Sequence, residues 1–474
     1  MSGKYDTVIT GSGPNGLSAA IYLQQQGLRT LVLEGKPEPG GSTRTAEATL
    51  PGFYHDIGSA VHPLALASPY LSRLPLNEFG LEWIHPELPL AHPMRDGRVV
   101  TLYKDIDRFA ETLGDDGEMY KKLIEPLVSH WDRLSPELLS PLKWPSNPFL
   151  LARFGLRAFW SASFLNKKLF KNPDTRTFFS GLAAHSGLPL DATASSAFGL
   201  VLAATAHAVN WPVPKGGAQG LAKALVGYYK SLGGELRCNE TVKAISDLPD
   251  AKSYIFDVTP TQLLAIDGLE LSSSYRKKLE RFEYGPGIFK IDLALNEPIP
   301  WHNPECGKAG TIHLGTTADE IATSEAGLGH KVIPENPYVI LSQPTLLDPS
   351  RAPEGKHIAW AYCHVPNGSD ADMYEPVIKQ IEKVALGFRD TILHSSTMNC
   401  SQMEAWNPNL VGGDVNGGLQ KLGQLFFRPV AKLKPYRTSV DNVYMCSSST
   451  PPGGGVHGMC GYHAAKTVFE DHFS

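Results

Sequence analysis

The sequence predicts an α/β protein in which a parallel sheet is assembled from distant stretches of chain around an inserted α+β unit. Three observations predict this architecture. A strand, a glycine turn, a helix and a second strand follow one another over residues 5–34. A strand that leads into a proline and glycine turn and a final helix occupies residues 442–465. Helical and strand-like stretches without a second glycine fingerprint fill the space between them.

The first unit has the residue types that a dinucleotide requires. Apolar residues lead into Gly11, Gly13 and Gly16, and a helix-period segment follows. The first glycine permits a tight turn, the second a close approach of the pyrophosphate, and the third close packing of helix and strand. Glu34, eighteen positions after Gly16, is placed to accept hydrogen bonds from ribose hydroxyls. The predicted contacts in this unit are Gly11, Gly13, Pro14, Asn15, Gly16 and Glu34.

The loop after Glu34 narrows the prediction from a dinucleotide to FAD. It carries two adjacent glycines and then Arg44, which can bring backbone N–H groups and a guanidinium to the pyrophosphate and flavin side. A surface ion pair is the alternative for Arg44. A strand over residues 56–58 is expected to pass beneath the cofactor. The predicted contacts here are Gly40, Gly41, Ser42, Arg44, Gly58 and Ser59.

The end of the chain supplies a second cofactor loop. Residues 451–455 form a proline and triple-glycine turn that begins the final helix. Free N–H groups at such a turn suit the pyrimidine edge of a flavin, where negative charge accumulates on reduction, and we expect Gly455 and Val456 to lie there. His457 adjoins this loop and is the first candidate for a catalytic base, with a packing role as the alternative.

Composition excludes several classes of protein. The net charge of −5 over 474 residues gives no global reason to expect nucleic acid as a partner. The six cysteines form no CxxC pair, so neither a metal site nor a dithiol centre is expected. The nucleotide-binding strand begins close to the initiator Met, and no apolar run is long enough to span a bilayer, so a cytoplasmic protein is expected.

Residues 71–210 are expected to be mainly helical. Within them, residues 149–171 combine large apolar and aromatic side chains with basic ones and carry no acid. Such a segment either lies in the headgroup region of an anionic membrane or forms a core helix with a basic outer face. His185 and His207 stand among small and apolar residues and are weaker catalytic candidates, as is His313; hydrogen-bonded core histidines are the alternative.

The stretch from 211 to 262 returns the chain to the nucleotide-binding sheet. A glycine turn opens a helix over 221–231, and strands follow, so that backbone atoms near Val242 can meet the adenine. Residues 263–428 again have the pattern of a substrate region, with strands over 288–295, 311–314, 338–343 and 357–364 and a helix over 373–391. No second glycine fingerprint occurs here, so a built-in NAD(P) domain is not expected.

Together these motifs resemble the phytoene dehydrogenase-like FAD oxidoreductases, a branch of the amine oxidase superfamily. The pieces that carry the resemblance are Gly11, Gly13 and Gly16 with Glu34, the Gly40–Gly41 loop with Arg44, Asp56 to Gly58, Val213 to Gly217, and Pro452 to Gly458. The last of these is most similar to the sub-branch related to pyridine-nucleotide-disulfide oxidoreductase-domain proteins. The resemblance implies a discontinuous Rossmann-like FAD-binding domain over 1–70, 211–262 and 429–474. It implies an inserted α+β substrate domain over 71–210 and 263–428.

The expected reaction is dehydrogenation of an apolar, isoprenoid-like small molecule, in which hydride passes to flavin N5 and a proton leaves the neighbouring carbon. The electron acceptor is expected to be a quinone or oxygen. Two alternatives remain open at this point: an oxygen-using amine or amino-acid oxidase, and a flavoprotein whose FAD is structural or which isomerises double bonds.

Overall fold

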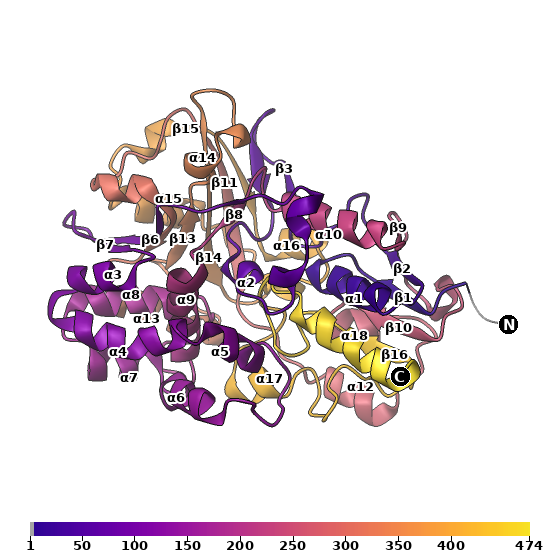
Figure 1. Ribbon diagram of the computed structural model, residues 1–474. Coiled ribbons are helices and arrows are strands. Elements are labelled where there is room, and N and C mark those ends of the chain that lie inside the picture. Colours follow the sequence, from indigo (N-terminus) through magenta and orange to yellow (C-terminus); the bar gives the residue numbers. More distant parts are fainter. Residues whose placement is uncertain (1–3) are drawn as a thin grey trace.

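The computed structural model describes residues 4–474 and contains two large sheets side by side (Figure 1). The five-stranded sheet is entirely parallel, with the order β16-β10-β1-β2-β9. Its strands come from the start, the middle and the end of the chain, as the sequence pattern predicts. They are β1 (Thr7–Thr10), β2 (Thr30–Leu33), β9 (Glu235–Arg237), β10 (Ser253–Phe256) and β16 (Val443–Met445).

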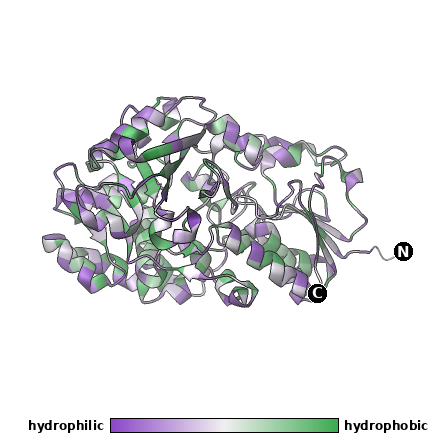
Figure 2. Cartoon of the chain, turned by 90° about the horizontal axis from the view of Figure 1, so that it is seen from above, coloured by the Kyte–Doolittle hydropathy of each residue, from purple (hydrophilic) through white to green (hydrophobic). Residues whose placement is uncertain are grey.

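Helices cover both faces of this parallel sheet, because its strands are apolar on both sides. On one face, Ile9 and Ile255 pack beneath α1 (Pro14–Gln25), α10 (Gln219–Ser231) and α18 (Met459–His472). On the other, Val8 and Phe256 pack beneath α11 (Pro260–Leu264) and α12 (Ser273–Leu279). Seen from above, helices flank the edge of this sheet near the N-terminus (Figure 2). The result is the Rossmann-like FAD-binding fold that the sequence predicts.

Two glycines allow the helices on the first face to come very close to one another and to the sheet. A Cβ atom on Gly16 would lie 2.1 Å from the carbonyl oxygen of Gly11, and one on Gly461 would lie 1.8 Å from that of Asn15. No side chain fits at such distances. Gly16 is therefore required where α1 leaves β1, and Gly461 where α18 crosses the start of α1.

The seven-stranded sheet is antiparallel except for one parallel pair, β6 with β12. Its order is β15-β11-β14-β13-β12-β6-β7. The strands are β6 (Leu88–Pro93), β7 (Val99–Leu102), β11 (Gly287–Leu295), β12 (Ala309–Leu314), β13 (Val339–Ser342), β14 (His357–Val365) and β15 (Ile392–Met398).

Helices also cover both faces of the seven-stranded sheet. One face carries α15 (Tyr374–Glu382). The other carries a helical layer, at the lower left of Figure 1, whose members pack on side chains such as Leu90 and Ile340. This layer is α3 (Ile106–Thr112), α4 (Gly117–Val128), α5 (Trp131–Leu138), α6 (Pro148–Ala158), α7 (Ala162–Leu169), α8 (Pro173–Ala184), α9 (Ser196–Val209) and α13 (Ala318–Ala326).

Short elements connect the two sheets. A hairpin of β3 (Thr45–Glu47) and β4 (Tyr54–Asp56) and a pair of β5 (Trp83–Ile84) and β8 (Val213–Pro214) lie between them. The remaining short helices are α2 (Pro63–Leu66), α14 (Pro344–Leu347), α16 (Cys400–Trp406) and α17 (Leu422–Phe426). Across residues 4–474, no helix has the length and apolar character needed to cross a bilayer.

Three expectations about secondary structure are wrong in part. The strand expected over residues 56–58 lies earlier, as β4, and ends at Asp56. The mainly helical stretch 71–210 also contributes β6 and β7, which are stabilised as strands by pairing with β12, far away in sequence. The helix expected over 373–391 ends at Glu382. Gly387, with φ of +85°, then turns the chain into a short 3₁₀ segment, Phe388–Thr391, because a left-handed residue cannot continue an α-helix.

Candidate active site

A cavity of about 660 Å³ runs from the glycine turn after β1 to the strands of the seven-stranded sheet. Of the predicted cofactor contacts, all but Gly16 and Gly40 line it. The lining members are Gly11, Gly13, Pro14, Asn15, Glu34, Gly41, Ser42, Arg44, Gly58, Ser59, Val242, Gly455 and Val456. Residues that are far apart in sequence therefore meet around one space.

The carboxylate of Glu34 is fixed at the end of β2, where a ribose is expected. One oxygen accepts a hydrogen bond from the Ser12 backbone N–H at 3.0 Å, and the other accepts from the Lys36 N–H at 2.9 Å. The first oxygen also accepts from the Ser12 hydroxyl, so both of its lone pairs are used, whereas the second oxygen keeps a lone pair that can accept from a ribose hydroxyl. This arrangement fits the ribose of a bound dinucleotide.

The glycine turn forms a backbone cradle that fits a pyrophosphate. A Cβ atom on Gly41, whose φ is +55°, would lie 2.9 Å from Gly13 Cα, so two backbone segments approach with no side chain between them. The N-terminus of α1 begins at this point, with Pro14 in its first turn. The buried Oδ1 of Asn15 has no partner among residues 4–474 and can accept from a ligand hydroxyl or N–H, though not from the pyrophosphate oxygens, which are themselves acceptors.

Arg44 lies at the junction of the two halves of the cavity. Its Nε donates to the carbonyl oxygen of Gly41 at 3.0 Å, and its guanidinium lies 4.5 Å from the centre of the Trp406 ring, which also lines the cavity. Partial burial lowers the pKa of Arg44 from its usual value, which leaves the group charged at neutral pH. The positive charge is held in place by the loop and the indole, within reach of an anionic cofactor.

Asp257 is a residue of this site that the sequence analysis missed. It follows β10 directly, and its Oδ2 accepts the Gly16 N–H at 2.9 Å, while Cβ atoms on Gly11 or Gly13 would lie 3.0 Å from its side chain. The signal that could have found it is its position, because ligands of parallel α/β sheets bind at the carboxyl ends of the strands. Burial raises the pKa of this carboxyl to about 7, and the nearby Glu34 charge adds to the effect.

We expect the FAD affinity of the apoprotein to fall by at least about tenfold between about pH 6 and about pH 8.5, because ionised Asp257 would repel the pyrophosphate. Its raised pKa also means that stability present at low pH is lost as the pH rises through about 7. Flavin fluorescence titration at both pH values measures the change in affinity. Asp257→Asn should bind FAD with no such pH dependence, and an equal slope in both proteins would contradict the assignment.

The other half of the cavity is apolar and aromatic. Residues of the seven-stranded sheet and of α9 supply most of its wall: Leu202, Trp211, Ile288, Thr311, Ile340, Ser342, Trp360 and Tyr362. The acidic residues of the lining, Glu34, Glu240 and Asp257, all lie at the nucleotide end. The apolar half therefore offers no carboxylate to an ammonium group.

His185 is the predicted catalytic candidate that reaches the apolar half. It caps the C-terminus of α8, borders the cavity, and its Nε2 lies 2.8 Å from Nε2 of His313. Its Nδ1 makes no hydrogen bond within residues 4–474. Burial lowers the pKa of His185 to about 3, so its ring is neutral at physiological pH and can accept a proton.

His313 and His92 form a buried layer behind His185. Nε2 of His92 donates to the Gly315 carbonyl oxygen at 2.8 Å, and a Cβ atom on Gly181 would lie close to Nδ1 of both rings. Neither Nδ1 has a partner in the described chain. This layer fixes the ring of His185 through His313 while leaving its other nitrogen free.

The other two predicted catalytic histidines lie outside the cavity lining. Nδ1 of His457 accepts the Met459 N–H at 3.1 Å, and burial lowers the pKa of His457 to about 4. His207 uses both ring nitrogens within the helical layer: Nδ1 donates to the Lys104 carbonyl oxygen at 3.0 Å and Nε2 lies 2.9 Å from the Tyr120 hydroxyl. His207 therefore has the contacts of a packing residue, whereas the buried Nε2 of His457 has no partner among residues 4–474.

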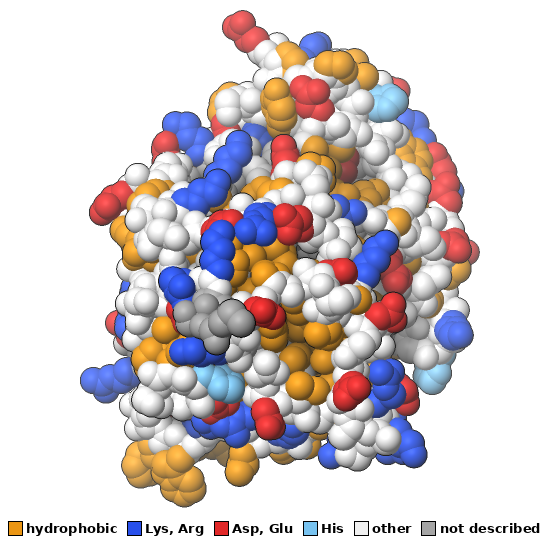
Figure 3. Space-filling model, turned by 90° about the vertical axis from the view of Figure 1, so that its right-hand side faces the viewer, with side chains coloured by type: hydrophobic (Ala, Val, Ile, Leu, Met, Phe, Trp, Pro, Cys, Tyr) orange, Lys and Arg blue, Asp and Glu red, His pale blue; other side chains and the backbone are white. Residues whose placement is uncertain are grey.

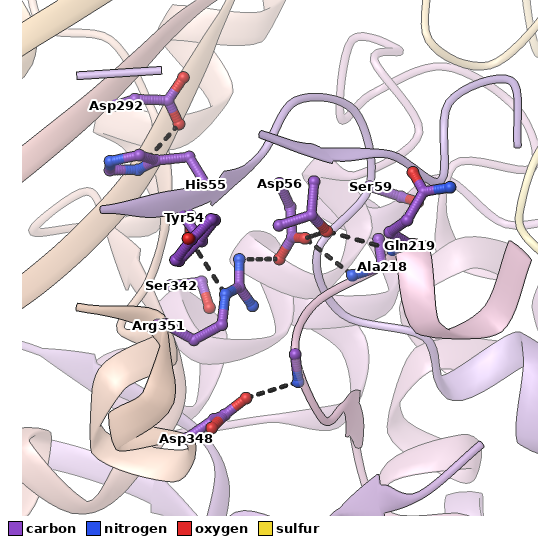
Figure 4. A network of polar contacts seen from close by, with 12 residues as sticks. Tyr54, His55, Asp56, Ser59, Ala218, Gln219, Asp292, Ser342, Asp348 and Arg351 are labelled. Carbon is purple, nitrogen blue, oxygen red and sulfur yellow. Dashed lines mark hydrogen bonds and ion pairs between the residues drawn. The ribbon is translucent and has the colours of Figure 1, made fainter. Parts of the chain in front are cut away.

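A buried polar network joins the two halves of the site (Figure 4). Arg351, which ends a 3₁₀ turn after α14, forms an ion pair at 3.0 Å with Asp56 of β4 and donates to the Tyr54 carbonyl oxygen at 3.0 Å. The other oxygen of Asp56 accepts from the Ala218 N–H at 2.8 Å and from the Thr45 hydroxyl at 2.7 Å. Three distant segments thus meet at Asp56, beside the cavity.

The Rossmann-like sheet, the glycine cradle and the Glu34 carboxylate at the ribose position define a FAD-dependent oxidoreductase. A sequence profile described as "Flavin containing amine oxidoreductase" matches residues 15–267, more than half of the chain. The chain belongs to this family of flavin-containing amine oxidoreductases.

Similar proteins extend over nearly the whole chain. Pyridine nucleotide-disulfide oxidoreductase domain-containing protein 2 of Mus musculus is 26% identical over 99% of this chain and 94% of that protein. Phytoene desaturase (lycopene-forming) of Pseudescherichia vulneris is 24% identical over 96% of each chain. The crystal structure of an oxidoreductase from Methanosarcina mazei has a TM-score of 0.68 at 17% identity, covering 98% of this chain and all of that one. The match to the phytoene dehydrogenase-like branch is thereby confirmed.

Proposed function

We propose that the protein dehydrogenates an apolar, isoprenoid-like small molecule. The observation that carries the proposal is the apolar half of the cavity, where aromatic and aliphatic side chains form the wall and no carboxylate is present. An amine substrate arrives as a cation, and burying it without a counter-charge is costly, so this half of the cavity favours a hydrocarbon over an amine. A relative of similar length, named phytoene desaturase (lycopene-forming), supports the same substrate class.

The chain's residues have three roles in this proposal. Glu34, Arg44 and the glycines of both loops hold the cofactor, and bound FAD supplies a two-electron acceptor for hydride at N5. The apolar wall excludes water and orients the substrate C–H bond toward that acceptor.

His185 takes the proton that leaves the neighbouring carbon, at Nδ1, while its Nε2–H donates to Nε2 of His313. One C–H bond is lost as hydride and the other as a proton, and a carbon–carbon double bond forms. A base of low pKa suffices, because a C–H bond beside an electron-deficient carbon is strongly acidic.

The direct test is anaerobic mixing of the FAD-loaded protein with two panels of compounds, isoprenoid hydrocarbons and primary amines. We expect the absorbance of oxidised flavin to bleach with a member of the hydrocarbon panel and to stay unchanged with the amines. Bleaching by amines alone would contradict the proposal and favour an amine oxidase. Isomerised hydrocarbon without bleaching would favour a non-redox enzyme.

The electron acceptor is tested separately. We propose that a quinone accepts the electrons from the reduced flavin, because a cavity that admits an apolar substrate can also admit an apolar quinone. After chemical reduction, we expect a soluble quinone to reoxidise the flavin faster than dissolved oxygen does, as measured by stopped-flow absorbance. Faster reaction with oxygen and release of hydrogen peroxide would identify an oxidase instead.

A further inference from the structure

An apolar surface stands out on the outer side of the helical layer. It is formed by α6, α7, the loop that precedes α6, and α17, and we call it the α6 surface. Hydrophobic side chains protrude at the lower edge in Figure 3, the edge at which α6 and α17 lie in Figure 1. Its exposed apolar members are Leu142, Trp144, Phe149, Leu156, Phe159, Phe164, Phe426 and Phe427.

Helix α6 is apolar on two opposite sides. Phe154 and Ala158 pack into the core beneath it. Phe149, Leu156 and Phe159 recur at helical spacing on the outer side, where 91%, 70% and 49% of their surface is exposed. An ordinary surface helix carries polar residues on its outer side. The outer side of α6 is thus built for contact with something apolar.

A distant segment of the chain completes the surface. The ring of Phe426, at the end of α17, stacks on Phe159 with their centres 6.2 Å apart. Trp144, in the loop before α6, is 92% exposed, so its large apolar side chain contributes little to the packing of the fold. Contiguous exposed apolar patches of this kind mark interaction sites in proteins that are otherwise well packed.

The chain segments that form the α6 surface carry basic residues and no acid, and the acids that lie against them, Glu137 beside Lys143 and Glu283 beside Lys421, come from neighbouring segments. Residues 138–173 contain no Asp or Glu, and neither do residues 415–440. The first of these stretches carries the basic residues Lys143, Arg153, Arg157, Lys167, Lys168 and Lys171. Aromatic rings flanked by an excess of Lys and Arg match the headgroup region of an anionic bilayer.

We propose that the α6 surface binds the surface of an anionic phospholipid bilayer, with its aromatic side chains at the depth of the headgroups and its basic residues at the phosphates. A second copy of the chain fits less well. A two-fold contact through this surface would bring two sets of like charges together with no acid from either stretch to compensate them. The proposal does not depend on the reaction that the protein catalyses.

Flotation of the FAD-loaded full chain with vesicles tests the proposal. We expect the protein to float with vesicles of phosphatidylcholine mixed with phosphatidylserine and to stay behind with phosphatidylcholine alone. Binding should weaken as salt is raised, because exposed charges are screened. Failure to float with the mixed vesicles at low salt would overturn the proposal.

Two sets of variants assign the binding to this surface. Trp144→Ala/Phe149→Ala and Lys167→Gln/Lys168→Gln should each weaken partitioning by at least about tenfold. The controls remove exposed side chains elsewhere: Val332→Ala/Leu386→Ala for the apolar pair, at 56% and 76% exposure, and Lys223→Gln/Lys379→Gln for the charges. The controls should float as the wild type does.

Folding and self-association are checked on the same samples. All the substituted side chains are exposed, so each variant is expected to fold. Flavin content and circular dichroism check this. Equal flotation of both surface variants and the wild type would place the binding elsewhere and overturn the proposal. Analytical ultracentrifugation could instead show a dimer that dissociates only in the Trp144→Ala/Phe149→Ala variant, together with no lipid binding. That result would identify a second copy of the chain as the partner of the α6 surface and would also overturn the proposal.

Discussion

Replacing Asp56 by Asn is expected to lower the free energy of unfolding by about 3–5 kcal/mol. The change leaves the guanidinium of Arg351 buried without its counter-charge, and both side chains are almost completely inaccessible, with 2% and 1% of their surface exposed. Equilibrium urea unfolding of the protein, followed by tryptophan fluorescence, measures the loss.

Two further variants show whether the cost comes from the unpaired charge. Arg389→Gln removes a partner of Glu375 from an exposed pair and should cost no more than about 1 kcal/mol. The double variant Asp56→Asn/Arg351→Met, which removes both charges, should recover much of the stability that Asp56→Asn loses. If Asp56→Asn costs no more than Arg389→Gln, the ion pair does not hold the two halves of the site together.

The second large effect is expected at His185. His185→Ala should lower the rate of flavin reduction by the proposed substrate by about 10²–10⁴-fold, the usual contribution of a positioned base. Stopped-flow absorbance under anaerobic conditions measures the rate, with FAD content checked first. Because burial lowers the pKa of His185 to about 3, the wild-type rate should show no titration of this group between about pH 5 and about pH 9.

Matched substitutions separate proton transfer from positioning. His185→Gln keeps a hydrogen-bonding group near Nε2 of His313 but cannot accept a proton, so it should be as slow as His185→Ala. Recovery of the rate in His185→Gln would mean that the residue only positions its surroundings. His457 lies outside the cavity lining, so the flavin of the His457→Gln variant should be reduced at about the wild-type rate. An unchanged rate in His185→Ala would remove it from the reaction.

The cofactor half of the site could be predicted because its requirements are local. A tight turn, a close backbone approach and an acid after the second strand each demand particular residues at a fixed spacing, as Gly11, Gly13 and Glu34 show. Gly41 belongs to the same class, since its positive φ and its distance to Gly13 leave no room for a side chain. Such residues can be recognised within one short stretch of sequence.

The substrate half could not be predicted, because its contacts join residues that no spacing connects. Trp211 comes from a loop and Ile340 and Trp360 from two different strands, and other apolar residues would have matched those strands equally well. The strand β6 is stabilised by β12 from a stretch more than two hundred positions away. Asp257 belongs to the stretch 211–262, which is expected to return to the nucleotide-binding sheet, but only the folded chain places it beside Gly16. The ranking of His185 above His457 likewise depends on which side chain reaches the cavity.

The order of strands in the parallel sheet has a consequence for how the protein is made. Strand β1 leaves the ribosome long before its neighbour β10, which begins at residue 253, and β16 closes the edge of the sheet only at residue 443. Both loops of the cofactor site are therefore complete only after residue 455 has been synthesised. Full binding of FAD has to wait for that point. The outer edge of β2 stays unpaired until β9 is made, that of β1 until β10 is made, and that of β10 until β16 is made. Each edge is open to wrong pairing with other chains until then.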